Sequence, residues 1–368
     1  MNARADWRTT LASLAPAFAE RAVQLDESGD EFVAENYREL KESGLYAAGV
    51  PHELGGEGLE LAELCDMLRT MARSCSSTAL AFSMHTHQVA VNAWRLKHQK
   101  APVTPLLEKV ARDKVLILTT GGGDWLDSSG DAVPAEGGFR VNARKPFSSG
   151  APAGNILSTS AVVRDKNEVI HFGIPMSTPG VSIKPTWRSM GMRNTASHDI
   201  VLENVLVPES AVAARRPQGK WHPLFHLISM LSLPLVYAVY VGVAEAARER
   251  AIGIVRKRRA DEHLLQAVGE MENQVESARI AHASWVAFCK DAQPGPATTS
   301  KSMIHRTLTA RGVLGTVDAT MDVAGGAAFF RSNGLERLFR DAQGARYHPL
   351  QEGLQKALSA RHALGLEI

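Results

Sequence analysis

Glycine clusters in this chain could form a binding site for a phosphate group, because glycine-rich turns let a backbone approach a phosphate closely. They lie at residues 55–56, 121–123 and 325–326. None has the spacing GxGxxG or GxxxxGK(S/T) that brings a phosphate onto the N-terminus of a helix. The spacing argues against a Rossmann or P-loop nucleotide site. Each cluster taken alone is typical of a turn or a close-packing position.

Histidine and cysteine are the usual ligands of transition metals, and neither is arranged for that role here. His85 and His87 form an H-x-H pair in an expected helix, so their side chains project in different directions. Cys65, Cys75 and Cys289 are far apart and form no CxxC motif. We therefore predict no metal site, no disulfide framework and a reducing, cytoplasmic location.

The composition indicates a folded protein without a polyelectrolyte partner. The chain has 368 residues, 45% of them hydrophobic, enough to bury one large core or two to three smaller ones. Lys and Arg total 41 against 39 for Asp and Glu, a formal net charge of +2. No nucleic-acid partner is expected from this balance. The first residues are charged and interrupted by polar residues, unlike a secretory signal peptide.

Hydrophobic periodicity divides the chain into helical, extended and again helical parts. Helices are expected at residues 30–40, with Asp30 as candidate N-cap, and at 61–72 and 77–94. After Val115 the pattern alternates, as in strands. The expected strands are residues 115–118, 139–143, 156–163, 169–174 and 200–207.

The last third of the chain predicts long helices at residues 224–259 and 264–289, followed by two more. Residues 224–243 are nearly apolar and long enough to resemble a membrane span. They contain polar side chains and Pro234, and no second such segment exists in the sequence. We expect a helix buried on all sides in a bundle and no membrane span.

Segregated helices and strands argue against alternating βαβ units and for a segregated α+β protein. We predict an N-terminal helical domain at residues 1–113. A middle β domain follows at residues 114–218, and a C-terminal helical bundle at residues 219–368.

Three motifs follow this layout in order. Residues 50–58 read VPHELGGEG, and residues 190–195 read MGMRNT before VLENVLVP at 201–208. Gly325 and Gly326 precede LERLFRDA at residues 335–342. These segments resemble three motifs of the acyl-CoA dehydrogenase superfamily: a loop between N-terminal helices, the exit G-x-R-x-T … F-x-D-V-x-V-P from the middle domain, and the C-terminal signature GG-x-G-[YF] … E-R-x-x-R-D.

The resemblance implies the acyl-CoA dehydrogenase fold: an N-terminal all-α domain, a middle β-barrel or sandwich domain and a C-terminal four-helix bundle. It implies FAD bound between the β domain and the bundle, usually in a homotetramer, so a homo-oligomer (dimer or tetramer) is expected. The expected substrate is an acyl-CoA thioester, and the expected partner is an external electron acceptor. The family's F-G-x-P stretch after the cationic run 256–259 is missing here, so FMN stays an alternative to FAD.

The same resemblance assigns flavin-binding residues in the β domain. Leu118, Thr119 and Thr120 match a strand whose backbone and hydroxyl groups line the flavin ring. Residues 145–150, KPFSSG, match the family segment K-W-I-T-N-G. This match makes Phe147, Ser148 and Ser149 flavin contacts and places the Ser148 hydroxyl near N5, where a fixed donor assists hydride transfer. An ordinary turn is the alternative for this segment.

Other assignments by resemblance lie in the helical parts. Gly325 and Gly326 would approach the cofactor of a neighbouring subunit, and Arg256 would contact the FAD pyrophosphate unless it is part of a solvated surface. His85 and His87 lie on a helix that usually contributes to the substrate cavity of this fold.

The catalytic base of a dehydrogenase is missing from its usual places. Dehydrogenation of an acyl thioester needs a carboxylate to take the α-proton. Counting by the family pattern reaches Pro349, and the alternative family position falls at Ser232. Glu352, one helical turn beyond Pro349, could substitute if the last helix begins late; the favoured alternative is an exposed acid in the first turn of that helix.

His348 lies directly before the family's catalytic position. A histidine there is similar to the flavin-dependent monooxygenases of the same fold, in which reduced flavin reacts with oxygen and imidazole assists. The aromatic-Ser pair Phe147-Ser148 favours the same group. Imidazole ordinarily titrates near neutral pH, so it can donate and accept a proton. A histidine that caps the following helix is the structural alternative.

Three hypotheses follow. The first is an FAD-dependent oxidoreductase that dehydrogenates an acyl-CoA-like thioester, with Glu352 or an unidentified acid as base. The second is a two-component flavin monooxygenase that uses O2, His348, Ser148 and a partner flavin reductase. The third is a non-catalytic binding protein with the same fold.

Overall fold

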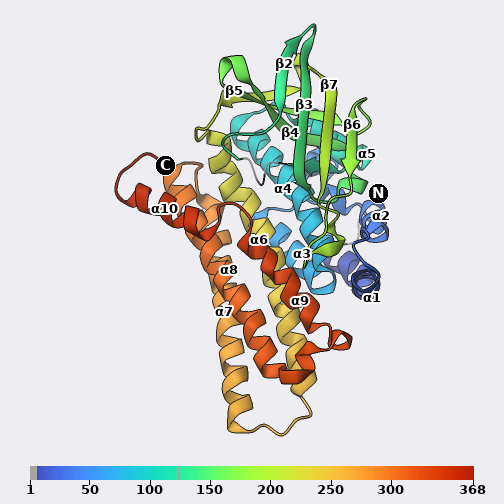
Figure 1. Ribbon diagram of the computed structural model, residues 1–368, viewed down its shortest axis with the longest axis vertical. Coiled ribbons are helices and arrows are strands. Elements are labelled where there is room, and N and C mark those ends of the chain that lie inside the picture. Colours follow the sequence, from blue (N-terminus) through green and yellow to red (C-terminus); the bar gives the residue numbers. More distant parts are fainter. Residues whose placement is uncertain (1–5, 121, 123–124) are drawn as a thin grey trace.

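The computed structural model describes residues 6–120, 122 and 125–368, and Figure 1 shows helices, then a sheet, then helices along the chain. The expected segregated α+β order is confirmed. Two members of the glycine cluster at residues 121–123, Gly121 and Gly123, lie outside the described residues. The N-terminal helices are α1 (Trp7–Ser28), α2 (Ala34–Glu42), α3 (Leu61–Ser74), α4 (Ser76–Gln99) and α5 (Thr104–Asp113).

The prediction of Asp30 as a helix N-cap is wrong. Helix α2 begins at Ala34, and its N-cap residue is Val33. The carboxylate of Asp30 instead accepts a hydrogen bond of 2.8 Å from Nε of Arg193, a residue of the β domain. A distant cation therefore competes successfully with the local backbone for this side chain.

The middle part forms one eight-stranded sheet in which β1 pairs in parallel with β4, outside the main strand order β6-β7-β3-β2-β4-β5-β8. Alternating apolar residues such as Phe139, Val141 and Ala143 are buried on one face of β3, which pairs antiparallel with β7. The strands are β1 (Ile117–Thr119), β2 (Asp131–Ala135), β3 (Gly138–Ser148), β4 (Ile156–Val163), β5 (Glu168–Pro175), β6 (Val181–Lys184), β7 (His198–Pro208) and β8 (Val212–Pro217).

The C-terminal helices extend away from the sheet to the lower end of the molecule (Figure 1). Helix α6 is the centre of this bundle and contacts the N-terminal domain through α3 and α4. At Gly242 a Cβ atom would lie 2.3 Å from the carbonyl oxygen of Arg69, so this approach of α6 to α3 requires glycine. The helices are α6 (Pro223–Val255), α7 (Glu262–Asp291), α8 (Pro296–Ala324), α9 (Leu335–Ala342) and α10 (Glu352–Ala363).

Helix α6 is long and apolar enough to cross a membrane, but 94% of its most apolar window is buried inside the protein. Its tyrosines, Tyr237 and Tyr240, are both fully buried. The expected description of this segment as a core helix is therefore confirmed. The same burial places polar groups of α6 beside the loops that carry the candidate site.

Candidate functional site

His348 lies in the loop between α9 and α10. Its Nε2 atom is 2.7 Å from the hydroxyl of Tyr240, and its ring packs against those of Tyr237 and Tyr240. Burial and, second, the guanidinium of Arg306 lower the pKa of His348 to about 4. The imidazole is therefore neutral at physiological pH, instead of titrating there as an unperturbed histidine does.

Tyr240 orients this imidazole. Burial raises the pKa of Tyr240 well above its ordinary value, so the hydroxyl keeps its proton and can donate to Nε2 of His348. With Tyr240 as the donor, the ring proton lies on Nδ1, for which no hydrogen-bond partner exists within residues 6–120, 122 and 125–368; the same distance also fits donation from Nε2–H to the phenol oxygen. In the Nδ1–H tautomer His348 can donate a hydrogen bond from Nδ1 to a bound molecule.

Two helices hold the loop that carries His348. Arg306 of α8 is almost fully buried and donates to the carbonyl oxygens of Ala345 and His348 at 3.0 and 2.9 Å. The hydroxyl of Tyr237 on α6 donates to the same carbonyl of Ala345 at 2.7 Å. Because hydrogen bonds from a charged donor are strong, these contacts fix the backbone of the loop before any ligand binds.

Glu352, the alternative base, has two cationic partners. It is the first residue of α10 and forms ion pairs with Arg311 and, at 2.7 Å, with Lys356. Hydrogen bonds from Arg311 and Lys356 lower the pKa of Glu352 to about 2. So acidic a carboxyl group is a weak base, and Glu352 is poorly suited to take an α-proton.

Ser148 ends strand β3 and fits the proposed flavin contact chemically. Its side chain is fully buried, and its Oγ atom has no hydrogen-bond partner in the described part of the chain. A buried hydroxyl without a partner is costly, and a ligand nitrogen or carbonyl would remove that cost. The neighbouring Ser149 is already bonded to Ser197 at 2.8 Å, and Phe147 is exposed beside Trp187.

Ser148→Val is expected to shift the visible absorbance spectrum or the reduction potential of protein-bound flavin with little loss of folding. The change removes the hydroxyl and nearly conserves volume, so a difference reports on that one donor. Absorbance spectra of flavin-loaded variants measure it. Ser182 of β6 has an equally buried Oγ atom without a described partner, so Ser182→Val is the matched control. Identical spectra for the Ser148 variant and the unaltered protein would remove Ser148 from the flavin site.

The expected flavin strand β1 borders a cavity. The side chain of Leu118 is fully buried in the core, so only its backbone could contact a ligand. Thr119 and Thr120 line a cavity of about 570 Å³, which we call the sheet-side cavity, between helices α4 and α5, strands β1, β4 and β5, and the first turns of α6. Ile228 of α6 lines it one helical turn before Ser232, whose buried Oγ atom lacks a partner among the described residues. The cavity therefore leads toward the family's alternative catalytic position.

His85, expected at the substrate cavity, does not line the sheet-side cavity. Its Nδ1 atom accepts a hydrogen bond of 3.0 Å from the backbone N–H of Ile117, and its Nε2 atom is 2.8 Å from the carbonyl oxygen of Tyr46. Both ring nitrogens connect α4 to backbone, and burial lowers the pKa of His85 to about 4. His87 is also buried and does not line the sheet-side cavity, although its Nδ1 atom has no described partner.

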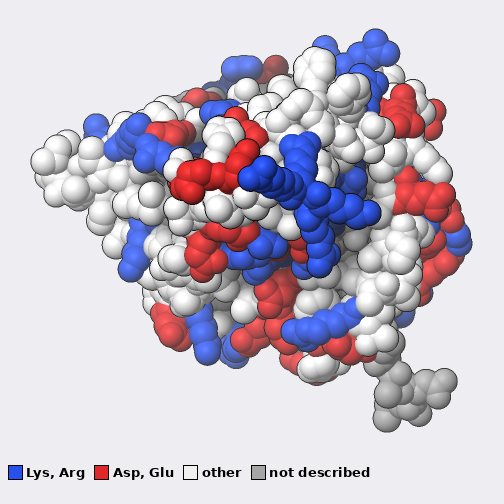
Figure 2. Space-filling view, turned by 90° about the horizontal axis from the view of Figure 1, so that it is seen from below, with Lys and Arg blue, Asp and Glu red and all other residues white. Residues whose placement is uncertain are grey.

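The remaining expected cofactor contacts lie at the far end of the bundle. Figure 2, which views that end, shows Lys and Arg side chains gathered near the middle of the face. The exposed run 256–259 follows α6 there, and Arg258 donates to the carbonyl oxygen of Ala324, directly before Gly325 and Gly326. Within one chain, Arg256 and both glycines are therefore far from the β domain (Figure 1).

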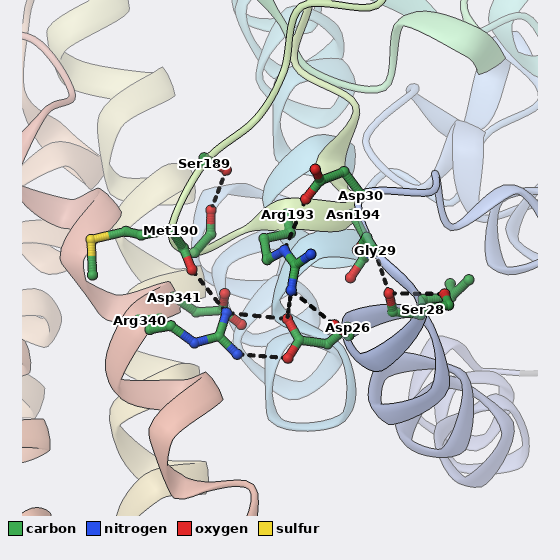
Figure 3. Close-up of polar contacts among 12 residues, drawn as sticks. Asp26, Ser28, Gly29, Asp30, Ser189, Met190, Arg193, Asn194, Arg340 and Asp341 are labelled. Atoms are coloured by element: carbon green, nitrogen blue, oxygen red, sulfur yellow. Dashed lines mark hydrogen bonds and ion pairs between the residues drawn. The ribbon is translucent and has the colours of Figure 1, made fainter. Parts of the chain in front are cut away.

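The family-like motifs around Arg193 and Arg340 form an ionic clamp between three parts of the chain (Figure 3). Asp26 of α1 pairs with Arg340 of α9 at 2.6 Å, and its backbone oxygen accepts from Arg193 at 2.9 Å. Asp341 accepts hydrogen bonds from the backbone of Met192 and from Ser76. The motifs thus join the N-terminal domain, the β domain and the bundle.

The clamp also brings the two candidate catalytic segments to one junction. The segment with Met192 contacts α9, and Thr195 in the same segment accepts a hydrogen bond of 2.8 Å from the N–H of Gly150. Ser148 precedes that turn, and His348 follows α9. Both residues therefore border the junction of β domain and bundle, although no direct contact between them is described.

Several residues of this site escaped the sequence analysis. Tyr240 and Arg306 are a buried phenol and a buried cation in helices, and no local sequence signal marks either of them. Asp26 looks like an ordinary polar residue of a helix surface. The partners of these residues lie in distant segments of the chain, which hydrophobic periodicity does not identify.

Comparison with known proteins agrees with this architecture. Models of the acyl-CoA dehydrogenase N-terminal, middle and C-terminal domains match residues 6–107, 120–205 and 235–352. "Putative acyl-CoA dehydrogenase YdbM" of Bacillus subtilis is 26% identical over 93% of this chain and 92% of its own length. Amino sugar nitrososynthase DnmZ of Streptomyces peucetius is 26% identical over 84% of this chain and 81% of its own length.

A solved structure of KijD3 in complex with FMN and a dTDP-linked amino sugar shares the fold. It superposes with a TM-score of 0.89 at 24% identity, covering 98% of this chain and 94% of that one. All three domain models match in order, and together they span most of the chain. The protein belongs to the acyl-CoA dehydrogenase family of flavin-dependent enzymes.

Proposed function

We propose that this protein is a flavin-dependent monooxygenase that uses reduced flavin and O2. One observation carries the proposal: directly before Pro349, the position at which dehydrogenases hold a catalytic carboxylate, the neutral imidazole of His348 is oriented by the buried Tyr240. The nearest acidic alternative, Glu352, is neutralised by two cations. A neutral hydrogen-bond donor suits oxygen activation, whereas removal of an α-proton requires a base.

The residues of the chain have separate tasks in this proposal. Arg306 and Tyr237 fix the loop, and Tyr240 sets the tautomer, so that His348 presents Nδ1–H to the reacting oxygen. Ser148 supplies a hydroxyl at the flavin edge. Reduced flavin, when bound, supplies the two electrons of the reaction. Substrate and O2, with two electrons and two protons, give the hydroxylated substrate and water.

The relatives support the proposal without excluding dehydrogenation. A nitroso group contains an N–O bond, so the name of DnmZ describes a product of oxygen transfer. YdbM, which matches almost the whole chain, favours the second candidate function, dehydrogenation of an acyl-CoA thioester with passage of electrons to an external acceptor. The absence of a suitably basic carboxylate at both family positions places monooxygenation first.

We propose FMN or FAD as the flavin, delivered in reduced form by a separate reductase. FMN needs no adenylate site, which suits a chain whose cationic run 256–259 lies at the far end of the bundle. FAD would need the cationic run 256–259 of a second copy of the chain as its adenylate site. Phe329 and Phe330 are exposed at 88% and 64% beside Gly325 and Gly326, as expected of a surface that a homo-oligomer covers.

The experiment that tests the proposed function compares two assays on the same preparation. We expect rapid oxygen uptake and flavin reoxidation when reduced FMN or FAD is added aerobically, and no bleaching of bound oxidised flavin by a panel of acyl-CoA thioesters under anaerobic conditions. Anaerobic bleaching by a thioester would establish the dehydrogenase instead. A protein that binds neither flavin in either redox state would have a binding function only.

A further inference from the structure

The sheet-side cavity carries two cations at its outer end. Along α4 the lining residues Asn92, Arg95 and Gln99 become progressively more exposed, so the cavity opens toward the C-terminus of this helix. Lys109 of α5 lines the same end and is exposed. Two basic side chains therefore stand where a ligand would enter.

In the part of the chain that the structure describes, no carboxylate forms an ion pair with Arg95, which is half-buried. Lys109 forms no ion pair there either, although Asp113, one turn further along α5, is close enough for its pKa to be lowered by Lys109. The described lining residues include no aspartate or glutamate. A half-buried guanidinium without a counter-ion favours an anionic ligand, because the surrounding low dielectric strengthens the attraction.

A third cation lies behind the wall of the cavity. Arg216 of β8 is almost fully buried, donates to Nε2 of His171 at 3.0 Å and to the carbonyl oxygen of Trp125 at 2.8 Å. Both His171 and Trp125 line the cavity. Arg216 thereby fixes the ring of His171 and the backbone of Trp125 in the wall of the cavity.

The rest of the lining is apolar and aromatic. The rings of Trp125 and Phe225 stack with centroids 5.3 Å apart, and Leu227 and Ile228 continue along α6 toward Ser232. An apolar molecular body fits this part of the cavity, with polar contacts from Thr119 and Thr120. The cavity therefore has a cationic outer end and an apolar part along α6, on the side of Ser232.

We propose that the substrate of this enzyme is an organic anion, whose carboxylate or phosphate group is bound by Arg95 and Lys109 and whose apolar body extends along α6. Arg95 and Lys109 determine specificity and take no part in the chemistry. The inference rests on the proposed function in one respect only: the molecule that binds here is taken to be the molecule oxidised.

Binding of model anions to the full, flavin-free chain tests the inference. The probes are naphthalene-2-carboxylate and 2-naphthyl phosphate, each paired with a neutral analogue, naphthalene-2-carboxamide or 2-naphthol. We expect isothermal titration to show that at least one anion binds about tenfold more tightly than its analogue, and that Arg95→Gln removes this preference. Equal affinities of both anions and their neutral analogues for the unaltered protein would overturn the proposal.

Matched controls separate this site from general charge effects and from the cofactor. Lys97→Gln removes one charge from the exposed side of α4, outside the cavity, and should leave anion affinity within about twofold. Binding of FMN and riboflavin is compared in the Arg95→Gln variant. Weaker binding of FMN together with unchanged binding of riboflavin would assign Arg95 to the phosphate of the cofactor and overturn the substrate assignment. Anion binding without oxygen uptake would refute only the proposed function.

Discussion

His348→Ala is expected to lower oxygen-dependent turnover by about 10²–10⁴-fold, the usual contribution of a positioned proton donor or acceptor. The imidazole of His348 is hydrogen-bonded to Tyr240 at 2.7 Å, and its Nε2 atom has no second partner among the described residues. Stopped-flow absorbance, with reduced flavin mixed into oxygenated buffer and substrate, measures the loss. Far-UV circular dichroism checks that the variant remains folded.

Three further variants give this prediction a sharp control. Glu352→Gln should keep turnover within about twofold, because the carboxylate is held by Arg311 and Lys356 and its pKa is too low for a base. His362→Ala removes a histidine of α10 away from the site. Tyr240→Phe should give an intermediate loss, since it frees the imidazole tautomer. Turnover that depends on Glu352 and not on His348 would contradict the monooxygenase mechanism.

The pH dependence follows from the lowered pKa of His348. The imidazole is neutral from about pH 5 upward, because its pKa of about 4 lies below the ordinary 6.5. In the unfolded chain it gains its proton near pH 6.5, so stability from neutral burial is complete above that pH and is lost as the pH falls toward 4. A plot of the rate of turnover against pH should therefore show no rise or fall near pH 6.5 that is due to His348.

Asp26→Leu is expected to lower the free energy of unfolding by about 1.5–3 kcal/mol, the usual contribution of hydrogen bonds to a charged group. The side chain of Asp26 is only 10% exposed, and it pairs with Arg340 at 2.6 Å and lies 3.8 Å from the guanidinium of Arg193. The substitution removes the anion that these two cations share at the junction of three domains, although Arg340 keeps Glu336 and Arg193 keeps Asp30. Urea denaturation followed by tryptophan fluorescence measures the change.

The exposed pair Asp131–Arg164 provides the control for this effect. Its side chains are 47% and 67% exposed, so Asp131→Leu should cost at most about 1 kcal/mol. The loss in the double variant Asp26→Leu/Arg340→Met should be smaller than the sum of the losses in the two single variants, because both single variants remove the same ion pair. Equal effects of Asp26→Leu and Asp131→Leu would show that the clamp contributes no more than a surface pair.

Elements with strong periodicity were predictable because local sequence dictates them. Residues 61–72 and 77–94 lie in α3 and α4, and residues 156–163 coincide with β4. Helix α1 and the short strands β2 and β6 were missed, because a weak apolar pattern or four to five residues give little signal. The motifs at residues 190–195 and 335–342 predicted the family, although not that they contact each other.

Side chains whose partners are distant in sequence were difficult to predict. Asp30 is of a residue type that favours the N-cap position, yet it pairs with Arg193, which lies 163 residues away. His85 could have faced a ligand, yet the backbones of Ile117 and Tyr46 occupy both of its nitrogens. Buried polar groups must find hydrogen bonds, and the nearest available partner in space decides which one.

The sequence by itself determined the order of helical and β domains, the flavoenzyme family, and the lack of a carboxylate at Pro349 and Ser232. Only the tertiary structure decided the protonation of the candidate groups. His348 meets Tyr240 across 108 residues of chain, and Glu352 meets Arg311. A pKa is set by burial and by charges within a few ångströms, and both are properties of packing between segments that the chain order does not specify.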